Sequence, residues 1–217
     1  MTAIGRRNFI AGASGLALGW TQSGWAAVPD SRNLTFNVFR KGSAIGTHSV
    51  AFEPAGEALT VRIAVDLAVK LGPITLYRYT LRGTEHWQRG VLMSASADTV
   101  DGGDKAWLRL ARQNGRLRVE GSAGQPYVAP DGSITASHWN PMELQAPMIN
   151  LQNGELLDFT VTPRGTQTVR ASGRDVSARQ YALTGPAEMN LWYDPADIWT
   201  RLRAVGTDGS EITYERA

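Results

Sequence analysis

The sequence contains no cysteine among its 217 residues. This absence excludes disulfide bonds, thiol nucleophiles and cysteine-based metal sites. It also excludes the lipid-modified cysteine found at the signal junction of a bacterial lipoprotein. A chain of this length still buries a sizeable hydrophobic core without covalent cross-links.

A net positive charge is absent from most of the chain. The whole sequence has 22 Lys and Arg residues and 20 Asp and Glu residues. Arg6 and Arg7 belong to the first 26 residues, which hold no acidic residue, so 20 basic residues remain against 20 acidic ones. An arginine cluster at 109–118 spans a predicted hairpin turn and is interpreted as a solvated tip. Nucleic-acid binding needs a basic footprint, so no nucleic-acid partner is predicted.

Motifs for catalysis and for phosphate binding are also absent. No Gly-rich phosphate loop occurs, and no Gly-x-Ser-x-Gly follows residue 26. None of the three histidines, His48, His86 and His138, has a partner at metal-ligand spacing. We therefore assign no catalytic residue, no metal ligand and no cofactor, and a non-enzymatic role is preferred while an enzyme stays open.

The first 26 residues have the features of an export signal. Arg6 and Arg7 precede a weakly apolar run that begins at Phe9. That run is too short and too rich in glycine to span a bilayer, which needs about 20 mostly apolar residues. Gly24 and Ala26 are small residues where a signal peptidase reads the chain. We predict a signal at 1–26, cleavage after Ala26, one domain at 27–217, and no transmembrane anchor in the mature chain.

The segment Arg6-Arg7-Asn8-Phe9-Ile10 resembles the twin-arginine export signal, although Ala11 stands where that signal usually has lysine. This resemblance implies export across a bacterial inner membrane. The predicted location of the mature protein is therefore the periplasm or the exterior of the cell.

Period-two alternation of apolar and polar residues dominates the rest of the chain. The longest example runs from Leu59 to Leu71, with seven aliphatic side chains on one face. Asn114-Gly115 is a strong hairpin signal, and similar turns recur to give roughly a dozen antiparallel strands. A flat open sheet of that size is disfavoured by strand twist. We predict an all-β fold: a single, strongly curled antiparallel sheet, either a half-barrel or a barrel-like meander.

Residues 122–150 form the longest stretch without strand alternation. Four prolines in this segment prevent a long regular element. We expect an irregular covering segment that lies across the mouth of the curl. It would supply five side chains to an apolar interior, namely Trp139, Met142, Leu144, Met148 and Ile149.

The stretch SHWNPMELQ at 137–145 has two interpretations. As an active site it offers His138 as a base, but Ser137 beside it would point to the opposite side of an extended chain. As a plug or pocket lining it offers Trp139, whose indole N–H needs a partner when buried. Asn140 before Pro141 suits a turn that satisfies local backbone groups. The plug or pocket lining is preferred.

Four motifs carry a resemblance to a known family. These are His138-Trp139-Asn140, the run INLQNGEL at 149–156, Leu191-Trp192-Tyr193-Asp194, and Asp208-Gly209-Ser210. Together they resemble a family of bacterial proteins, the domain of unknown function 6134. The resemblance implies an exported β-rich domain with no established activity. The candidate binding residues are His138, Trp139, Asn140, Met142, Trp192 and Tyr193.

Three function classes follow from these observations. In the preferred class, the concave face of the sheet binds an apolar or amphipathic molecule, such as a lipid, or an envelope partner. The alternatives are a periplasmic hydrolase of unrecognised type and a purely structural envelope protein. A looser similarity to other periplasmic curled-sheet domains, including the fold that carries lipoproteins between membranes, is one of architecture, which does not give function.

The export route is testable by replacing both Arg6 and Arg7 with lysine. The twin-arginine pathway requires the arginine pair, so we expect this variant to be retained in the cytoplasm when cell fractions are compared by immunoblotting. Mature protein in the periplasm at the wild-type level would contradict the twin-arginine route, since a general secretory signal tolerates lysine.

Overall fold

The computed structural model describes residues 28–206 and 208–217. The predicted signal, with Arg6, Arg7, Phe9 and the cleavage position after Ala26, lies outside the described residues.

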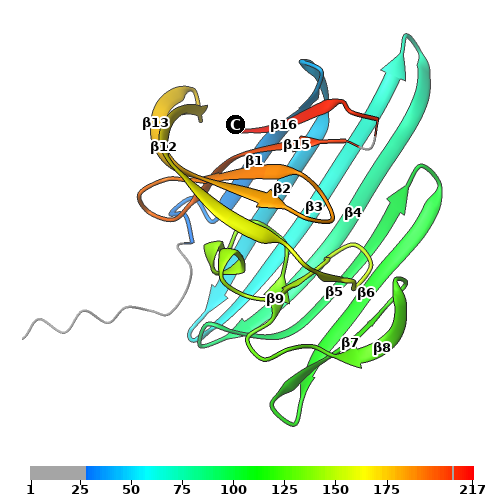
Figure 1. Cartoon of the computed structure of the whole chain (residues 1–217), viewed down its shortest axis with the longest axis vertical. Helices are drawn as coiled ribbons and strands as arrows, with labels where there is room; N and C mark the ends of the chain where they lie inside the picture. The colour runs from blue at the N-terminus through cyan, green and yellow to red at the C-terminus, as the bar shows by residue number, and fades with distance from the viewer. Residues whose placement is uncertain (1–27, 207) are drawn as a thin grey trace, which may run out of the picture.

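The main element is an antiparallel sheet of thirteen strands (Figure 1). Consecutive strands pair through short turns, as the alternation and turn signals predict. Along the sheet the order is β12-β13-β14-β15-β16-β1-β2-β3-β4-β5-β6-β7-β8, so β1 pairs with the C-terminal strand. The strands are β1 (Asn33–Arg40), β2 (Ser43–Ala55), β3 (Ala58–Leu71), β4 (Ile74–Gln88), β5 (Val91–Asp101), β6 (Asp104–Gln113), β7 (Arg116–Gly121), β8 (Gly124–Val128), β12 (Thr160–Ala171), β13 (Arg174–Thr184), β14 (Met189–Tyr193), β15 (Trp199–Val205) and β16 (Glu211–Arg216).

The sheet is open, which corrects one part of the predicted fold. The all-β class and the single large antiparallel sheet are confirmed, but the sheet is neither closed nor strongly curled. Its two edge strands, β12 and β8, each contain a proline, Pro163 and Pro126. Proline cannot donate to a strand ladder, so these edges are poorly suited to pairing, and closure into a barrel would require it.

The β3 strand shows why the alternating pattern folds as it does. Leu59, Val61, Ile63 and Val65 are all buried on one face, with at most 4% of their surface exposed. That face belongs to the core under the covering segment, as the alternation predicts. The pattern continues to Leu71, but burial does not, since Leu71 is 68% exposed at the end of the strand.

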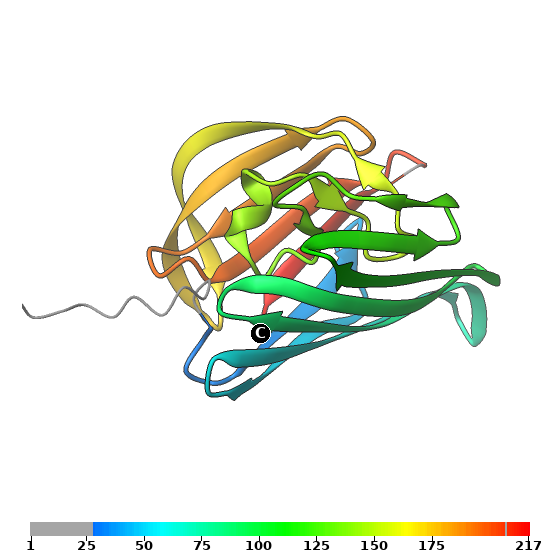
Figure 2. The same cartoon turned by 90° about the horizontal axis from the view of Figure 1, so that it is seen from below.

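The predicted irregular covering segment is present, between β8 and β12, and Figure 2 shows it against one face of the main sheet. Residues 124–128 of the expected segment form the edge strand β8 instead. Within the covering segment, a small sheet pairs β9 with β10 in parallel and β10 with β11 antiparallel. Its elements are β9 (Ile134–Thr135), the 3₁₀ helix η1 (Pro141–Leu144), β10 (Met148–Ile149) and β11 (Leu156–Leu157).

Four of the five side chains expected in the interior are buried or half-buried, and the exception is Met142. This residue is 53% exposed. Successive side chains of a 3₁₀ helix point in directions about 120° apart, because the helix has three residues per turn. The neighbouring Glu143 is fully buried, so Met142 faces solvent.

Two glycines allow the covering segment to approach the sheet. A Cβ at Gly83 of β4 would lie 3.3 Å from the Leu151 side chain. A Cβ at Gly121 of β7 would lie 2.1 Å from the Asn153 carbonyl oxygen, which is an impossible contact. At Gly121 the backbone of the segment therefore rests directly on the sheet, where any other residue would displace it, and Gly83 leaves room for the Leu151 side chain.

A buried carboxylate joins the sheet to the covering segment. Glu85 of β4 has no exposed surface. Its Oε2 accepts hydrogen bonds from the indole Nε1 atoms of Trp87 and Trp139, each at 2.9 Å, and its Oε1 accepts one from the Thr135 hydroxyl at 2.6 Å. Burial raises the pKa of Glu85, while the hydrogen bonds from Thr135, Trp139 and Trp87, and lastly the nearby Ser137 hydroxyl, act in the opposite direction. A glutamine at position 85 would have a single side-chain oxygen to accept hydrogen bonds from these three donors.

Replacing Glu85 with glutamine should lower the stability of the fold. The amide oxygen can keep the two indole donors, but the NH₂ group then donates to the Thr135 hydroxyl, whose own proton loses its acceptor; a buried unsatisfied donor costs about 1–3 kcal/mol. We expect the urea midpoint to fall with an unchanged m-value. Glu57→Gln is the matched control, because it breaks an exposed ion pair with Arg89, worth about 0–1 kcal/mol. Equal effects of the two substitutions would contradict the role assigned to Glu85.

Candidate ligand-binding cavity

A cavity of about 700 Å³ lies between the main sheet and the covering segment. Strands β2, β3, β4 and β16 form its wall on the sheet side, and residues 136–138 and 150–152 form its cover. Aliphatic side chains from four strands make the wall largely apolar, among them Ile45, Ile63, Val65, Leu67, Leu81 and Ile212.

Polar side chains surround the exposed end of the cavity, which we call the mouth. The Tyr77 hydroxyl donates to Asp101 at 2.5 Å. Across the mouth, Arg40 forms an ion pair with Asp208 and donates to the Ser210 hydroxyl at 3.0 Å. Hydrogen bonds from the Ser210 hydroxyl and backbone N–H, followed by the Arg40 guanidinium, hold the pKa of Asp208 well below its usual range. The charged side chains of Asp101, Arg40 and Asp208 at the mouth thus each have a partner already.

The inner end of the cavity, which we call the floor, holds buried polar groups without partners. His48, Ser137 and His138 all line the cavity. The His48 Nε2 and Ser137 Oγ atoms are buried and make no hydrogen bond to any part of the chain that the structure describes. Buried polar atoms of this kind are rare in folded proteins, because leaving them unpaired is costly.

His48 is held in an aromatic environment that keeps it uncharged. Its ring centroid lies 5.2 Å from that of Trp199 and 5.7 Å from that of Tyr214. Burial, with a smaller contribution from nearby His138, lowers the pKa of His48 to about 3. The floor therefore offers a neutral imidazole rather than a cation.

His138 is oriented by a buried carboxylate. Glu143 accepts from the His138 backbone N–H at 3.0 Å and lies 2.9 Å from its Nδ1. The Tyr193 hydroxyl lies 3.1 Å from the same carboxylate and 2.9 Å from the His138 carbonyl oxygen. Burial, and then the nearby Glu143, raises the pKa of Tyr193 well above its usual value, so the phenol remains a donor. With Nδ1 donating to Glu143, the Nε2 of a neutral His138 is free to accept.

The backbone at His138 explains why two adjacent residues line one cavity. His138 has a φ of 65°, a left-handed conformation that is uncommon for residues other than glycine. The expectation that Ser137 and His138 point to opposite sides assumes an extended chain. The left-handed residue removes that assumption, and both residues line the cavity.

The six candidate binding residues occupy different environments. His138 is the one that lines the cavity. Trp139 is buried against Glu85, and Asn140 accepts from the Met142 backbone N–H at 3.1 Å to begin η1. Tyr193 is buried and bonded to Glu143.

Met142 and Trp192 lie away from the cavity. Met142 is exposed, as described above. Trp192 packs with Val169 and Ala178 in a separate small cluster. It precedes the buried Tyr193 on β14, and successive residues of a strand face opposite sides of the sheet.

Sequence reasoning missed His48, Glu85 and Glu143. The strand pattern could have identified the first two, because alternate residues of a strand lie on the same face. His48 lies two residues before the buried Val50, and Glu85 lies two residues before the buried Trp87. No such signal marks Glu143, which lies in an irregular turn.

Two further properties were searched among the described residues. No group of three or more His, Asp or Glu side chains is arranged to hold a metal ion in residues 28–206 and 208–217. Over the same ranges, no helix has the length and apolar character needed to cross a membrane.

The neutral His48 predicts a specific pH dependence of stability. Its pKa is about 3 in the folded state and about 6.5 in the unfolded chain. The contribution of the neutral His48 to the free energy of unfolding is complete above about pH 6.5. It is lost as the pH falls toward 3, because the unfolded chain then binds a proton that the folded chain does not. Between pH 6.5 and 5 the loss should approach about 2 kcal/mol.

Urea unfolding at pH 7.5 and pH 5 measures this loss. His48→Phe should reduce the difference between the two pH values, whereas His86→Asn, at an exposed position, should leave it unchanged. An unchanged pH difference in His48→Phe would show that His48 has the same pKa in the folded and the unfolded state.

The fold is similar to a solved structure described as a "Beta-barrel-like Protein of Domain of Unknown Function DUF1849 from Brucella abortus". The TM-score is 0.60 at 9% sequence identity, and the similarity covers 85% of this chain and 94% of that chain. Identity this low shows a shared fold alone. No curated protein matches the chain. A family model described as "Domain of unknown function (DUF6134)" matches residues 36–217, and the chain therefore belongs to this family.

Proposed function

We propose that the protein binds an apolar molecule with an uncharged polar end, such as a long-chain alcohol, in the cavity under the covering segment. The observation that carries this proposal is the pairing of an aliphatic wall with unpartnered buried polar atoms at the floor. A hydroxyl group of a ligand would satisfy the His48 Nε2 atom, while its chain would contact the wall.

The size and chemistry of the cavity support this proposal. Pockets for small molecules are typically about 300–1,000 Å³, mostly apolar, with a few convergent polar groups. A volume of about 700 Å³ falls inside this range. His48 is uncharged at neutral pH, with a pKa of about 3. A ligand carboxylate beside His48 would therefore lose its hydration without gaining a cationic partner from this residue.

The anchoring of the covering segment also favours binding in a preformed site. Its two ends are held by separate contacts, through Trp139 on Glu85 at one end and through the Tyr127 hydroxyl on the Gly154 carbonyl oxygen, 2.9 Å away, at the other. A site that is ordered before binding avoids part of the entropic cost of binding. The signal-like residues 1–26 support the proposal that this activity lies outside the cytoplasm.

A second candidate function is hydrolysis. It is favoured by one observation, the 2.9 Å contact between His138 Nδ1 and the buried Glu143 next to a buried serine in the same cavity. The nucleophile and its base should lie within hydrogen-bond reach of each other. The Ser137 hydroxyl makes no hydrogen bond in the described parts of the chain, so binding is the stronger proposal.

Displacement of a fluorescent apolar probe tests the binding proposal. We expect dodecanol to compete better than dodecane or dodecanoate at pH 7.5. Leu67→Trp should fill the cavity and weaken dodecanol binding about tenfold or more, since it removes space for several methylene groups. His48→Phe should reduce the preference for the alcohol over the hydrocarbon by about three- to tenfold, the value of one hydrogen bond.

Val91→Trp is the matched control, because Val91 is 44% exposed and lies outside the cavity. It should bind like the wild type. Equal binding by Leu67→Trp and Val91→Trp would contradict the proposed site. Turnover of a dodecanoyl ester that is lost in His138→Ala would favour the hydrolase instead.

A further inference from the structure

The hairpin formed by the end of β3 and the start of β4 extends beyond the rest of the sheet. Pairing of β2 with β3 reaches Leu67, and pairing of β4 with β5 begins at Tyr79. Residues 68–78 therefore pair only with each other in the ladders of the described chain, through contacts such as Val69 with Tyr77. Figure 1 shows this hairpin as the cyan projection at the end of the sheet.

The projecting hairpin exposes aliphatic side chains at its end. Leu71 is 68% exposed, Ile74 is 61% exposed and Leu76 is 63% exposed. We call residues 69–77 the hairpin tip. A two-stranded hairpin that projects into water is marginally stable on its own, and a group of exposed aliphatic residues indicates a binding surface.

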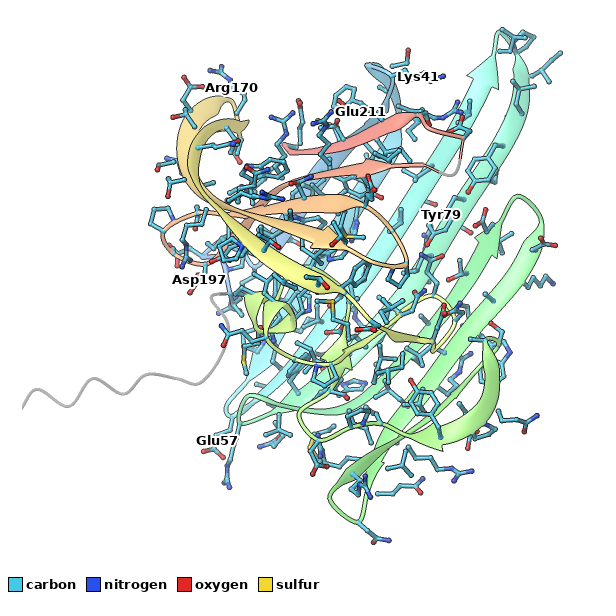
Figure 3. All side chains as sticks on the ribbon, in the orientation of Figure 1. Lys41, Glu57, Tyr79, Arg170, Asp197 and Glu211 are labelled. Carbon is cyan, nitrogen blue, oxygen red and sulfur yellow. The ribbon has the colours of Figure 1, made fainter. Side chains whose placement is uncertain are left out.

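Basic side chains flank the hairpin tip. Lys70 and Arg78 belong to the hairpin, and Lys41 lies in the turn between β1 and β2, labelled in Figure 3. All three line one groove beside the tip. None of them forms an ion pair with an acidic residue in the ranges that the structure describes, whereas Arg40 in the same groove is paired with Asp208. The surface around the aliphatic tip is thus open to a negatively charged partner.

We propose that the hairpin tip inserts into the surface of an anionic lipid bilayer. Exposed aliphatic side chains flanked by lysine and arginine are the combination that binds at such an interface, because the chains enter the acyl boundary while the cations meet the lipid headgroups. A second copy of this chain fits less well, since it would bring the same three unpaired cations together.

The tip is continuous with the mouth of the cavity. Val69, Leu76 and Tyr77 belong to the tip and also line the cavity. Docking would therefore hold the mouth at the lipid surface, where an apolar molecule passes between bilayer and cavity without crossing water. The transfer of a molecule between bilayer and cavity rests on the proposed function. The docking itself does not, because it depends on Leu71 and Ile74, which do not line the cavity.

A single fluorescent label tests the insertion in the full-length protein. The chain has no cysteine, so Thr75→Cys carries an environment-sensitive dye at the tip alone. Gln113→Cys labels an exposed position at the end of β6, beside the turn to β7, which antiparallel pairing places at the other end of the strands. With vesicles of phosphatidylglycerol and phosphatidylcholine, we expect a blue shift for the tip label and none for the Gln113→Cys label.

Substitutions at the tip separate the apolar and the charged contributions. Leu71→Ser with Ile74→Ser in the Thr75→Cys background should weaken partitioning about tenfold or more, since two exposed aliphatic side chains are lost. Lys70→Glu with Arg78→Glu should weaken it to a similar extent on anionic vesicles, and raised salt should act in the same direction. Dodecanol binding in solution should be retained by the serine variant, so failure of docking and failure of the proposed function give different results.

Three results would overturn the proposal. They are no blue shift of the tip label on anionic vesicles, an equal shift on pure phosphatidylcholine, or retention of the full shift in the serine variant. Concentration-dependent dimerisation in sedimentation velocity that the serine substitutions abolish would instead assign the tip to a second copy of the chain.

Discussion

The cavity exists because a buried carboxylate fastens an irregular segment to a regular sheet. Glu85 lies near the C-terminal end of the alternating strand β4, at a position where a hydrophobic residue would be expected. Glu85 accepts hydrogen bonds from Trp139 and Thr135, and these hold the covering segment in place. A further hydrogen bond from Trp87 of the same strand holds the Glu85 side chain in position. Burying a carboxylate is unfavourable unless it is fully hydrogen-bonded, so these contacts are mutually dependent. They act together with the hydrogen bonds of Tyr193 to His138 and of Tyr127 to Gly154, which also hold the cover over the aliphatic wall.

The strands were predictable because alternation is a local property. The pattern from Leu59 to Leu71 predicted both the strand β3 and its inward face, and the turn at Asn114-Gly115 predicted the β6–β7 hairpin. The openness of the sheet was not predictable in the same way. Closure depends on whether β8 and β12 meet, and these strands are separated by the whole covering segment in the sequence. The prolines in the two edge strands bear on this question only once the strand order is known.

The candidate site was predictable in part. Trp139 was expected to be buried with its indole N–H bonded, and both are confirmed, although its acceptor Glu85 lies 54 positions away. The binding candidates at Met142 and Trp192 were chosen for their chemical type, which does not say on which side of a turn or strand a residue falls. Strand parity places Trp192 opposite Tyr193. The left-handed backbone at His138 has no signal in the sequence, and it brings Ser137 and His138 to one cavity.

The same contacts that fix the cover also determine where a molecule could enter. Gly121 lets the backbone of the segment rest directly on the sheet, and Glu85 and Glu143 hold the stretch around Trp139 from within. Opening this cover would break several buried hydrogen bonds together, each of which leaves a costly unpaired group. The mouth, in contrast, is bounded by exposed side chains such as Tyr77 and Asp208 that rearrange in water at little cost. For the proposed ligand, entry would therefore follow the long axis of β3 and β4, from the projecting hairpin toward His48, with the cover as a wall of the cavity.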